Sequence, residues 1–378
     1  MRIVQLITRM DVLGGAQTHV MDLTKGLIEK DHEVIVISYG TSALTEQLQQ
    51  LNIQYIEIPS LTVPIHPFKD FRAFIHLKKI LQRVNPDLLA IHSSKVGIIG
   101  RLAGAYLKIP TVFTAHSWAF SGIESSWKKQ IFIKIERFVG LLSKGIITVS
   151  QYNLEEAIQY KIARKVDKTM IHNGIVDTIT STNRTRNKDS PIHLVMVARF
   201  ASPKNHRLLL DALKQVSHRS WKLTLVGGGP LLQDIQLYAK TCQLDKQITF
   251  TGESTNVEAI LQSADVFLLI STSEGLPISI IEAMRASLPT IASHVGGVNE
   301  LIDDSSTGFL VDKTDITQLT KRLELIINDD NLRRKLGINA RNKFLQQFAL
   351  EQMIDKTEHY YKQVLFQHQT NKQEVLQR

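Results

Sequence analysis

Two carboxylates flank the start of an expected helix in the second half of the chain. Glu274 lies in the loop after the apolar run Val266–Ile270, and Glu282 lies about one turn into the helix that Pro277 opens. Free N–H groups at that helix start attract an anion, and the carboxylates can accept hydrogen bonds from sugar and ribose hydroxyls. Alternatively, Glu274 caps the helix and Glu282 is a solvated surface residue.

Two permanent cations follow an earlier apolar run. Arg199 and Lys204 are five residues apart, at an expected strand end and close to a helix start. That arrangement suits a diphosphate that is bound without a metal ion, because guanidinium and ammonium groups both bind phosphate oxygens. A pair of surface cations is the competing interpretation. No Asp-x-Asp pair lies on a loop where it could chelate a divalent ion, so we expect no metal and no cofactor.

A glycine pair follows the first apolar run. Gly14 and Gly15 precede an expected helix, where glycine lets backbone N–H groups approach an anion closely. A tight turn that needs glycine explains the pair equally well.

The elements that must position these residues alternate along the whole chain. Short apolar runs are separated by helix-length amphipathic segments, which predicts α/β domains with parallel sheets. The expected strands are Ile3–Ile7, Glu33–Ser38, Gln54–Ile58, Asp87–His92, Thr111–Ala115, Gly145–Val149, Thr169–His172, Ile192–Arg199, Lys222–Val226, Ile248–Thr251, Val266–Ile270, Thr290–Ser293 and Phe309–Val311. The polar stretch 178–191 predicts a linker between a domain at 1–177 and a second at 192–354, with a C-terminal helix at about 355–378 packing back onto the first.

Composition narrows the class of protein. The 378 residues are 43% hydrophobic, enough for two full cores, and no run reaches the 18 or so apolar residues of a membrane span. No signal-peptide pattern is visible, and the single cysteine, Cys242, fits a cytoplasmic location. The net charge of +9 is concentrated within 69–101 and 128–144. This indicates either solvated helix faces or an anionic partner such as a phosphorylated substrate or a membrane surface, and nucleic acid is disfavoured because no binding motif accompanies the charge.

Motifs in a fixed order identify a family. Glu274 and Glu282 form a Glu-x7-Glu pattern, and the chain resembles the retaining glycosyltransferases of family 4, which have the GT-B fold of two doubly wound, Rossmann-like domains facing each other across a cleft. The other matching segments are GGAQTHV, FTAHS, ITVSQYN, HNGIV, VARF with a following KN, LTLVGGGP, FTG, SEGLPISIIEAM, ASHVGGVNELI and TGFLV. They span most of the chain.

The resemblance implies a hexosyltransferase that uses a nucleotide-sugar donor, with UDP as the default nucleotide. Glu282 corresponds to the residue that holds the ribose, and Glu274 to the one beside the transferred sugar. Arg199 and Lys204 correspond to the cations on the diphosphate, while His116 resembles the histidine that contacts the donor sugar. The remaining donor-binding residues implied are Gly15, Gly252, Glu253, Gly275, Leu276, Pro277, Ile278 and Ser279, with Gly252 and Glu253 at the nucleobase.

The acceptor is expected on the N-terminal domain. The segment after His116 carries Trp118, Phe120 and Trp127, followed by the basic and apolar segment Lys128–Leu142. Aromatic side chains beside cations suggest a lipid-linked glycan at an anionic membrane face, as in bacterial capsule or exopolysaccharide assembly. A buried stripe of a core helix is the alternative for Lys128–Leu142.

Other classes fit less well. Leu232 stands where a dinucleotide fingerprint needs its third small residue, and no phosphate-binding Gly-x4-Gly-Lys motif is present. A nucleotide-sugar epimerase, a non-catalytic carbohydrate-binding protein and a transferase with a small-molecule acceptor remain open.

Overall fold

The computed structural model describes residues 1–12, 14–62, 64–123, 125–179, 190–254 and 256–376. The chain forms two compact units: the first combines residues 1–174 with the segment from Leu350 onward, and the second spans 175–349. The corresponding limits expected from the sequence are 177, 192 and 354. Most of the expected linker, 178–191, lies outside the described residues.

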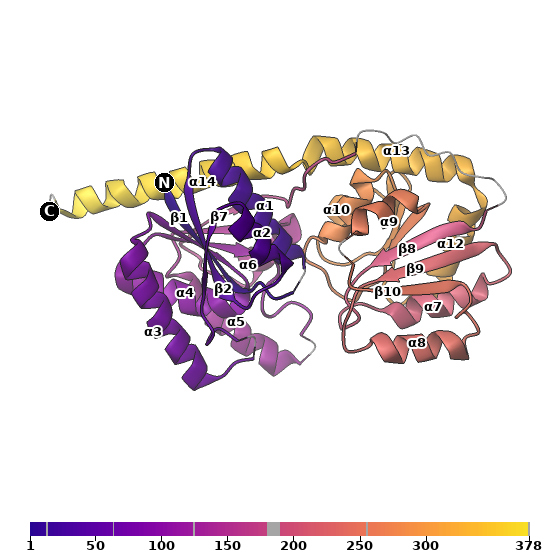
Figure 1. The fold of residues 1–378 in the computed structure, drawn as a ribbon, viewed down its shortest axis with the longest axis horizontal. Coiled ribbons are helices and arrows are strands. Elements are labelled where there is room, and N and C mark those ends of the chain that lie inside the picture. The colour runs from indigo at the N-terminus through magenta and orange to yellow at the C-terminus, as the bar shows by residue number, and fades with distance from the viewer. Residues whose placement is uncertain (13, 63, 124, 180–189, 255, 377–378) are drawn as a thin grey trace. The chain divides into compact units, whose positions relative to one another are not determined.

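The first unit contains, over its described residues, a seven-stranded parallel sheet in the order β3-β2-β1-β4-β5-β6-β7. Figure 1 shows helices packed around this sheet. Its strands are β1 (Arg2–Arg9), β2 (Glu33–Tyr39), β3 (Gln54–Glu57), β4 (Leu88–His92), β5 (Thr111–Ala115), β6 (Gly145–Thr148) and β7 (Asp167–Met170). Its helices are α1 (Gly15–Glu29), α2 (Ala43–Gln50), α3 (Pro67–Val84), α4 (Ser94–Leu107), α5 (Ser126–Gly140), α6 (Gln151–Gln159) and α14 (Leu350–Leu376).

Helices cover both faces of this sheet because both faces of its strands are apolar. Val4 and Leu6 of β1 pack with residues of α3, α4 and α5, whereas Ile3 of the same strand packs with α1 and α14. The C-terminal helix begins at Leu350, earlier than the expected 355, and buries Ile354 and Tyr361 in this core. The sheet is therefore doubly wound, and the end of the chain completes one of its faces.

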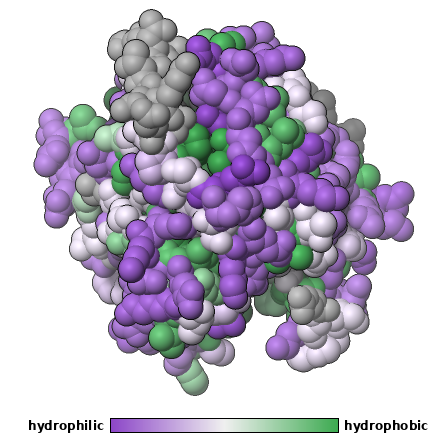
Figure 2. All heavy atoms as spheres, turned by 90° about the vertical axis from the view of Figure 1, so that its right-hand side faces the viewer, coloured by the Kyte–Doolittle hydropathy of each residue, from purple (hydrophilic) through white to green (hydrophobic). Residues whose placement is uncertain are grey.

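The second unit contains, among its described residues, a six-stranded parallel sheet in the order β10-β9-β8-β11-β12-β13. Its strands are β8 (Ile192–Val197), β9 (Trp221–Val226), β10 (Ile248–Gly252), β11 (Val266–Leu269), β12 (Thr290–Ser293) and β13 (Gly308–Val311). Its helices are α7 (His206–Gln215), α8 (Leu232–Thr241), α9 (Val257–Ser263), α10 (Ile278–Arg285), α11 (Val298–Leu301), α12 (Ile316–Asn328) and α13 (Asp330–Gln347). The face seen in Figure 2 is mostly hydrophilic, with hydrophobic residues scattered among polar ones.

Every expected strand is confirmed within two residues at each end. The largest differences are two residues: β1 ends at Arg9 instead of Ile7, β7 is shifted toward the N-terminus, and β8 ends at Val197 instead of Arg199. Within the described part of the chain, no helix is long and apolar enough to cross a membrane.

Candidate active site

The strand order of the second unit places β8 beside β11, where the winding of the sheet reverses. Ligands of open parallel sheets bind at such a point, outside the carboxyl ends of the strands. Arg199 and Lys204 follow β8, while Glu274 and α10 follow β11. The topology thus brings together two loops that the sequence analysis singled out separately.

Backbone hydrogen bonds join these two loops. Asn205 N donates to Ile270 O at 2.8 Å, and Thr272 N donates to Pro203 O at 2.9 Å. Lys204 Nζ then forms an ion pair with Glu274 Oε1, and the side chains of Lys204 and Glu274 are only 18% and 10% exposed. The cation assigned to a diphosphate and the carboxylate assigned to a sugar therefore lie side by side.

A third loop, which follows β12, packs against the backbone of Glu274. Gly296, after β12, has φ +53°, and a Cβ there would lie 1.9 Å from the Glu274 carbonyl oxygen. Gly297 N donates to Gly275 O at 2.9 Å. Only glycine permits both the backbone conformation and this close approach, so Gly296 sets the position of the Glu274 loop.

Helix α10 begins directly beyond this loop. Pro277 is the N-cap, with φ −70° and ψ 115°, and no side chain caps the first turn. Leu276, Pro277 and Ile278 are buried, so at these positions the backbone is what a ligand would meet. Glu282 lies in the second turn and is half-buried. The helix start therefore offers backbone N–H groups to an anion next to the Lys204–Glu274 pair.

Arg199, Gly252 and Glu253 lie on neighbouring loops of the same edge. Phe200 N donates to Gly228 O at 2.8 Å, and Gly227 N donates to Gly252 O at 2.8 Å, which links the ends of β8, β9 and β10. The side chain of Arg199 is exposed and has no ion-pair partner among the described residues. Arg199 thus remains available to bind an anionic ligand.

Three histidines gather at the carboxyl edge of the first unit. His19 comes from α1, His92 ends β4 and His116 follows β5. The ring centroids of His19 and His116 are 4.7 Å apart, and His92 Nδ1 lies 3.2 Å from His116 Nε2. His92 and His19 are buried and His116 is half-buried, so His116 is the member that a ligand can reach most easily.

Hydrogen bonds assign the proton on His116. His92 Nε2 lies 2.6 Å from Gln5 Oε1, an amide oxygen that can only accept, so His92 donates from Nε2. His92 Nδ1 must then accept from His116 Nε2, which leaves His116 Nδ1 as an acceptor. Burial lowers the pKa of His19 to about 4, partly offset by a hydrogen bond with Asn173, and lowers the pKa of His92 and His116 well below the usual value. All three are neutral at pH 7.

Within the part of the chain that the structure describes, these histidines form a group that could hold a metal ion. Their ligand nitrogens lie within 4.8 Å of one another, and neutral imidazoles are common ligands of transition metals. The expectation that the protein needs no metal stays a prediction.

Gly15 is the first residue of α1, as a ligand-binding helix start requires. The preceding Gly14 has φ −161°, an extended conformation that any residue adopts. The glycine pair is therefore not explained by a left-handed turn at Gly14.

The prediction that the side chains of Trp118 and Phe120 bind the acceptor is wrong, because both are buried. Their side chains are 3% and 0% exposed, and they stack on each other in the core with ring centroids 5.9 Å apart. Trp118 Nε1 donates to Asn153 O at 2.8 Å, which satisfies its polar atom inside the protein. Only Trp127, at the start of α5, is exposed. A short aromatic cluster after a strand looks the same in sequence whether it faces a ligand or the core.

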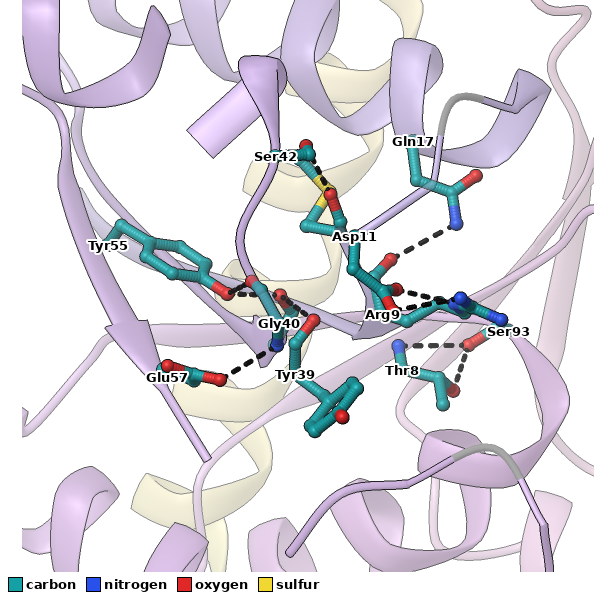
Figure 3. A network of polar contacts seen from close by, with 12 residues as sticks. Thr8, Arg9, Asp11, Gln17, Tyr39, Gly40, Ser42, Tyr55, Glu57 and Ser93 are labelled. Carbon is teal, nitrogen blue, oxygen red and sulfur yellow. Dashed lines mark hydrogen bonds and ion pairs between the residues drawn. The ribbon is translucent and has the colours of Figure 1, made fainter. Parts of the chain in front are cut away.

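Residues around the end of β1 were missed by the sequence analysis. Arg9 and Asp11 form a bidentate ion pair, with Nε–Oδ1 and Nη2–Oδ2 distances of 2.6 and 2.9 Å, beside Tyr39 at the end of β2 (Figure 3). Their position at the carboxyl end of a first strand is the signal that could have identified them.

Both units thus have the doubly wound architecture of GT-B glycosyltransferases. The structure of Anabaena HepE in complex with UDP and glucose matches with a TM-score of 0.83 at 18% identity, over 96% of this chain and 99% of that one. The fold is of the GT-B class.

Family profiles specify the assignment further. The profile of Glycosyltransferase Family 4 matches residues 13–178, and that of Glycosyl transferases group 1 matches residues 177–343. The chain belongs to glycosyltransferase family 4, and it is a hexosyltransferase that acts on a nucleotide sugar.

Two curated relatives align over nearly their whole length. The UDP-Gal:alpha-D-GlcNAc-diphosphoundecaprenol alpha-1,3-galactosyltransferase of Escherichia coli is 27% identical, over 93% of this chain and 94% of that protein. The N-acetyl-alpha-D-glucosaminyl L-malate synthase of Bacillus anthracis is 26% identical, over 95% and 96%. The relatives therefore include one enzyme named for a lipid-linked acceptor and one named for a small-molecule acceptor.

Proposed function

We propose that this enzyme transfers a hexose from a UDP-sugar, with retention of configuration, to a lipid-linked glycan during the synthesis of a bacterial cell-surface polysaccharide such as a capsule or exopolysaccharide. The observation that carries this proposal is the Lys204–Glu274 pair beside the start of α10 at the reversal point of the second sheet. It supplies a cation, backbone N–H groups and a sugar-binding carboxylate in one place.

Each donor group has an assigned partner in this proposal. Lys204 and the exposed Arg199 bind the diphosphate together with backbone groups of 275–279. Glu274 binds a hydroxyl of the transferred hexose, and Glu282 binds the ribose. Gly252 and Glu253 line the nucleobase site, where the exposed Glu253 side chain lies against Gly228.

The chemistry requires charge stabilisation more than proton transfer by the protein. The bond between the anomeric carbon and the β-phosphate oxygen breaks, and the acceptor oxygen attacks from the same face. The acceptor's proton passes to the departing phosphate oxygen, so UDP leaves without a protein nucleophile. Arg199, Lys204 and the α10 N-terminus stabilise the negative charge that develops on UDP, and we propose that no metal ion is required.

The first unit contributes His116 and the start of α1. We assign His116 to the transferred sugar, with its Nδ1 accepting a hydrogen bond from a hydroxyl, because His92 fixes the proton on Nε2. Gly15 N–H, at the start of α1, is assigned to the diphosphate.

The lipid-linked acceptor is supported by the diphosphoundecaprenol substrate named for the Escherichia coli relative. A small organic acid is the second candidate, and the malate acceptor named for the Bacillus anthracis relative favours it. The two acceptors differ in whether the enzyme has to work at a membrane.

A basic and apolar surface of the first unit supports the lipid-linked acceptor. Helix α4 contacts both α3 and α5, so the two basic segments of the sequence lie on one side of the first unit (Figure 1). We define the docking face as the exposed side chains of these helices: Phe68, Phe71, Tyr106, Trp127, Ile131, Phe138, Lys69, Arg72, Lys79, Arg83, Lys128 and Lys134. Large apolar groups among cations are typical of a surface that binds anionic lipid, and we propose that this face binds the inner surface of the cell membrane.

Nucleotide release from a panel of UDP- and GDP-sugars tests the proposed activity. We expect release from one UDP-sugar, an increase on addition of polyprenyl-linked membrane extract, and loss in Glu282→Ala. Stimulation by malate instead of the extract would select the small-molecule acceptor. Interconversion of the donor sugar without release would indicate an epimerase, and glycan binding without any turnover would indicate a binding protein.

Treatment with a chelator tests whether transfer depends on a metal ion bound by the histidine cluster. Transfer should be unchanged after exhaustive treatment with EDTA. Loss of activity that returns on addition of Zn²⁺ would contradict metal independence and would make His19, His92 and His116 its first candidate ligands.

A further inference from the structure

A cavity of about 370 Å³ opens at the carboxyl edge of the first sheet, and it falls in the size range of small-molecule sites. It lies where β1 and β2 end and α3 begins, and it is separate from the buried aromatic residues after His116. The residues that line it include Arg9, Asp11, Tyr39, Thr62, His66 and Lys69.

The walls of this cavity are held in place by contacts that need no ligand. Arg9 and Asp11 form their bidentate ion pair, and Gln17 Nε2 donates to Arg9 O at 3.1 Å (Figure 3). Thr62 and Pro64 of the lining are held by Lys95, whose Nζ donates to Thr62 O and Pro64 O and forms an ion pair with Asp70 at 2.7 Å. Because these side chains are already ordered, they lose little conformational entropy when a ligand binds in the cavity.

Its lining has the chemistry of a carbohydrate site with an adjoining anion. The Asp11 oxygens keep lone pairs, and the Arg9 guanidinium keeps N–H groups, that their mutual ion pair does not use. The Tyr39 ring offers an apolar face. Lys69 is exposed, and no ion pair of its side chain is present among the described residues. One carboxylate against two cations gives the lining a net positive charge.

The cavity lies near His116, on the same edge of the first sheet. Strands β2, β1, β4 and β5 are neighbours in that order, and adjacent strands are about 4.8 Å apart, so the end of β1 lies about 10 Å from that of β5. The Thr8 hydroxyl is 2.7 Å from Ser93 Oγ, which links the residue before Arg9 to the one after His92 (Figure 3). One acceptor molecule can span the cavity and the histidine cluster.

We propose that this cavity is the acceptor subsite and that it takes a sugar with an attached diphosphate. Asp11 and Arg9 bind hydroxyls of the acceptor sugar, the Tyr39 ring packs against its apolar face, and Lys69 binds the diphosphate. This inference rests on the proposed function, because it identifies the acceptor of the same reaction. It replaces the expectation that Trp118 and Phe120 form the acceptor site.

Direct binding tests the subsite without catalysis. The probes are farnesyl-diphospho-N-acetylglucosamine, in which a short chain replaces the natural lipid, and octyl N-acetylglucosaminide, which lacks the diphosphate. Lys69→Ala should weaken binding of the first probe about tenfold and leave the second unchanged, because a hydrogen bond to a charged group is lost. Asp11→Asn, which keeps the shape of the side chain, should weaken both.

Controls separate this inference from the proposed function. Lys246→Ala removes an exposed lysine of the second unit and should bind both probes like the native protein. UDP affinity, measured on all variants, should not change. The subsite would be overturned if the native protein did not bind the diphosphate probe, or if Lys69→Ala and Asp11→Asn both bound it as tightly as the native protein does. Absence of UDP binding and transfer in the native protein would instead overturn the proposed function.

Discussion

Lys204 and Glu274 are 70 residues apart in the chain, yet their side chains form an ion pair in a poorly exposed position. Before a donor binds, the pair satisfies a charge that would otherwise be buried alone. With a donor bound, the two charges have different assigned partners, the diphosphate for Lys204 and the hexose for Glu274. Substitutions at these residues should therefore affect different steps.

Lys204→Ala should lower UDP affinity about tenfold to a hundredfold, because a charge-assisted hydrogen bond to the diphosphate is lost. Glu274→Gln should leave UDP affinity within about twofold and lower kcat for transfer. Calorimetric titration with UDP and steady-state transfer rates separate these effects, with Lys246→Ala as the control. Equal losses of UDP affinity in both variants would contradict the division of roles.

The histidine cluster makes stability depend on pH. The pKa of His19 is about 4 in the folded protein and about 6.5 when the chain is unfolded, so the unfolded state binds more protons between these values. Stability from this group is complete above about pH 6.5 and is lost as pH falls toward 4, by about 3 kcal/mol on this shift.

Chemical denaturation of the native protein and His19→Gln at pH 7.5 and 5.0 measures this effect. The native protein should lose more stability than the variant on acidification. Exchange of the exposed His218 for glutamine is the control, and it should leave the native pH dependence intact. Parallel losses in the native protein and His19→Gln would show that His19 does not carry the effect.

At the scale of elements, the proposed donor site depends on how closely its loops pack. The loops after β8, β11 and β12 are joined by backbone hydrogen bonds, and α10 starts from the middle loop. Gly296 makes this packing possible, because its backbone approaches Glu274 more closely than any side chain would allow.

Gly296→Ala should destabilise the second unit and displace Glu274. Gly252→Ala is a matched control: both positions have positive φ, +53° and +69°, but a Cβ at Gly252 meets no atom within 4 Å. The control should cost about 1 kcal/mol from backbone strain alone, and Gly296→Ala should cost clearly more. Thermal unfolding of the two variants checks this, and similar Tm values would show that the close contact relaxes freely.

At the scale of the molecule, the docking face joins segments that are distant in the sequence. Phe68 of α3 is 79% exposed and Phe138 of α5 is 70% exposed, and cations surround both. Neither the positive charge nor the exposed aromatic side chains of the docking face would by themselves indicate a membrane as its partner. Together they combine electrostatic attraction with burial of aromatic side chains in the lipid interface.

Phe68→Ser combined with Phe71→Ser should lower partitioning onto anionic liposomes at least tenfold, because exposed aromatic area no longer enters the lipid. Lys79→Glu with Arg83→Glu should also lower it and should reduce its dependence on salt. Phe366→Ser removes an exposed phenylalanine of α14, on the other side of the first sheet, and should have no effect. Liposome sedimentation at low and physiological salt provides the measurement, and unchanged partitioning in both double variants would contradict the docking face.

The strands could be predicted from sequence because each is a short apolar run between polar turns, as at Val266–Leu269. The residues proposed to bind the donor, Glu274, Glu282, Arg199 and Lys204, could be singled out because they follow such runs and match family motifs. Local chemistry sufficed for both, since strand ends and helix starts are defined by a few adjacent residues.

Tertiary structure decided which side of a segment faces the solvent. Trp118 and Trp127 belong to one aromatic segment, yet the first is in the core and the second is exposed, because burial depends on which elements pack over each residue. The Lys204–Glu274 pair, the histidine cluster and the cavity beside Arg9 likewise depend on strand order, which places distant strand ends next to each other. The sequence by itself determined the fold class and the family, and it predicted the groups that would bind the donor. Only the tertiary structure decided which residues from distant segments lie in contact. The reason is that these contacts depend on the order of the strands in the sheet, which no single segment specifies.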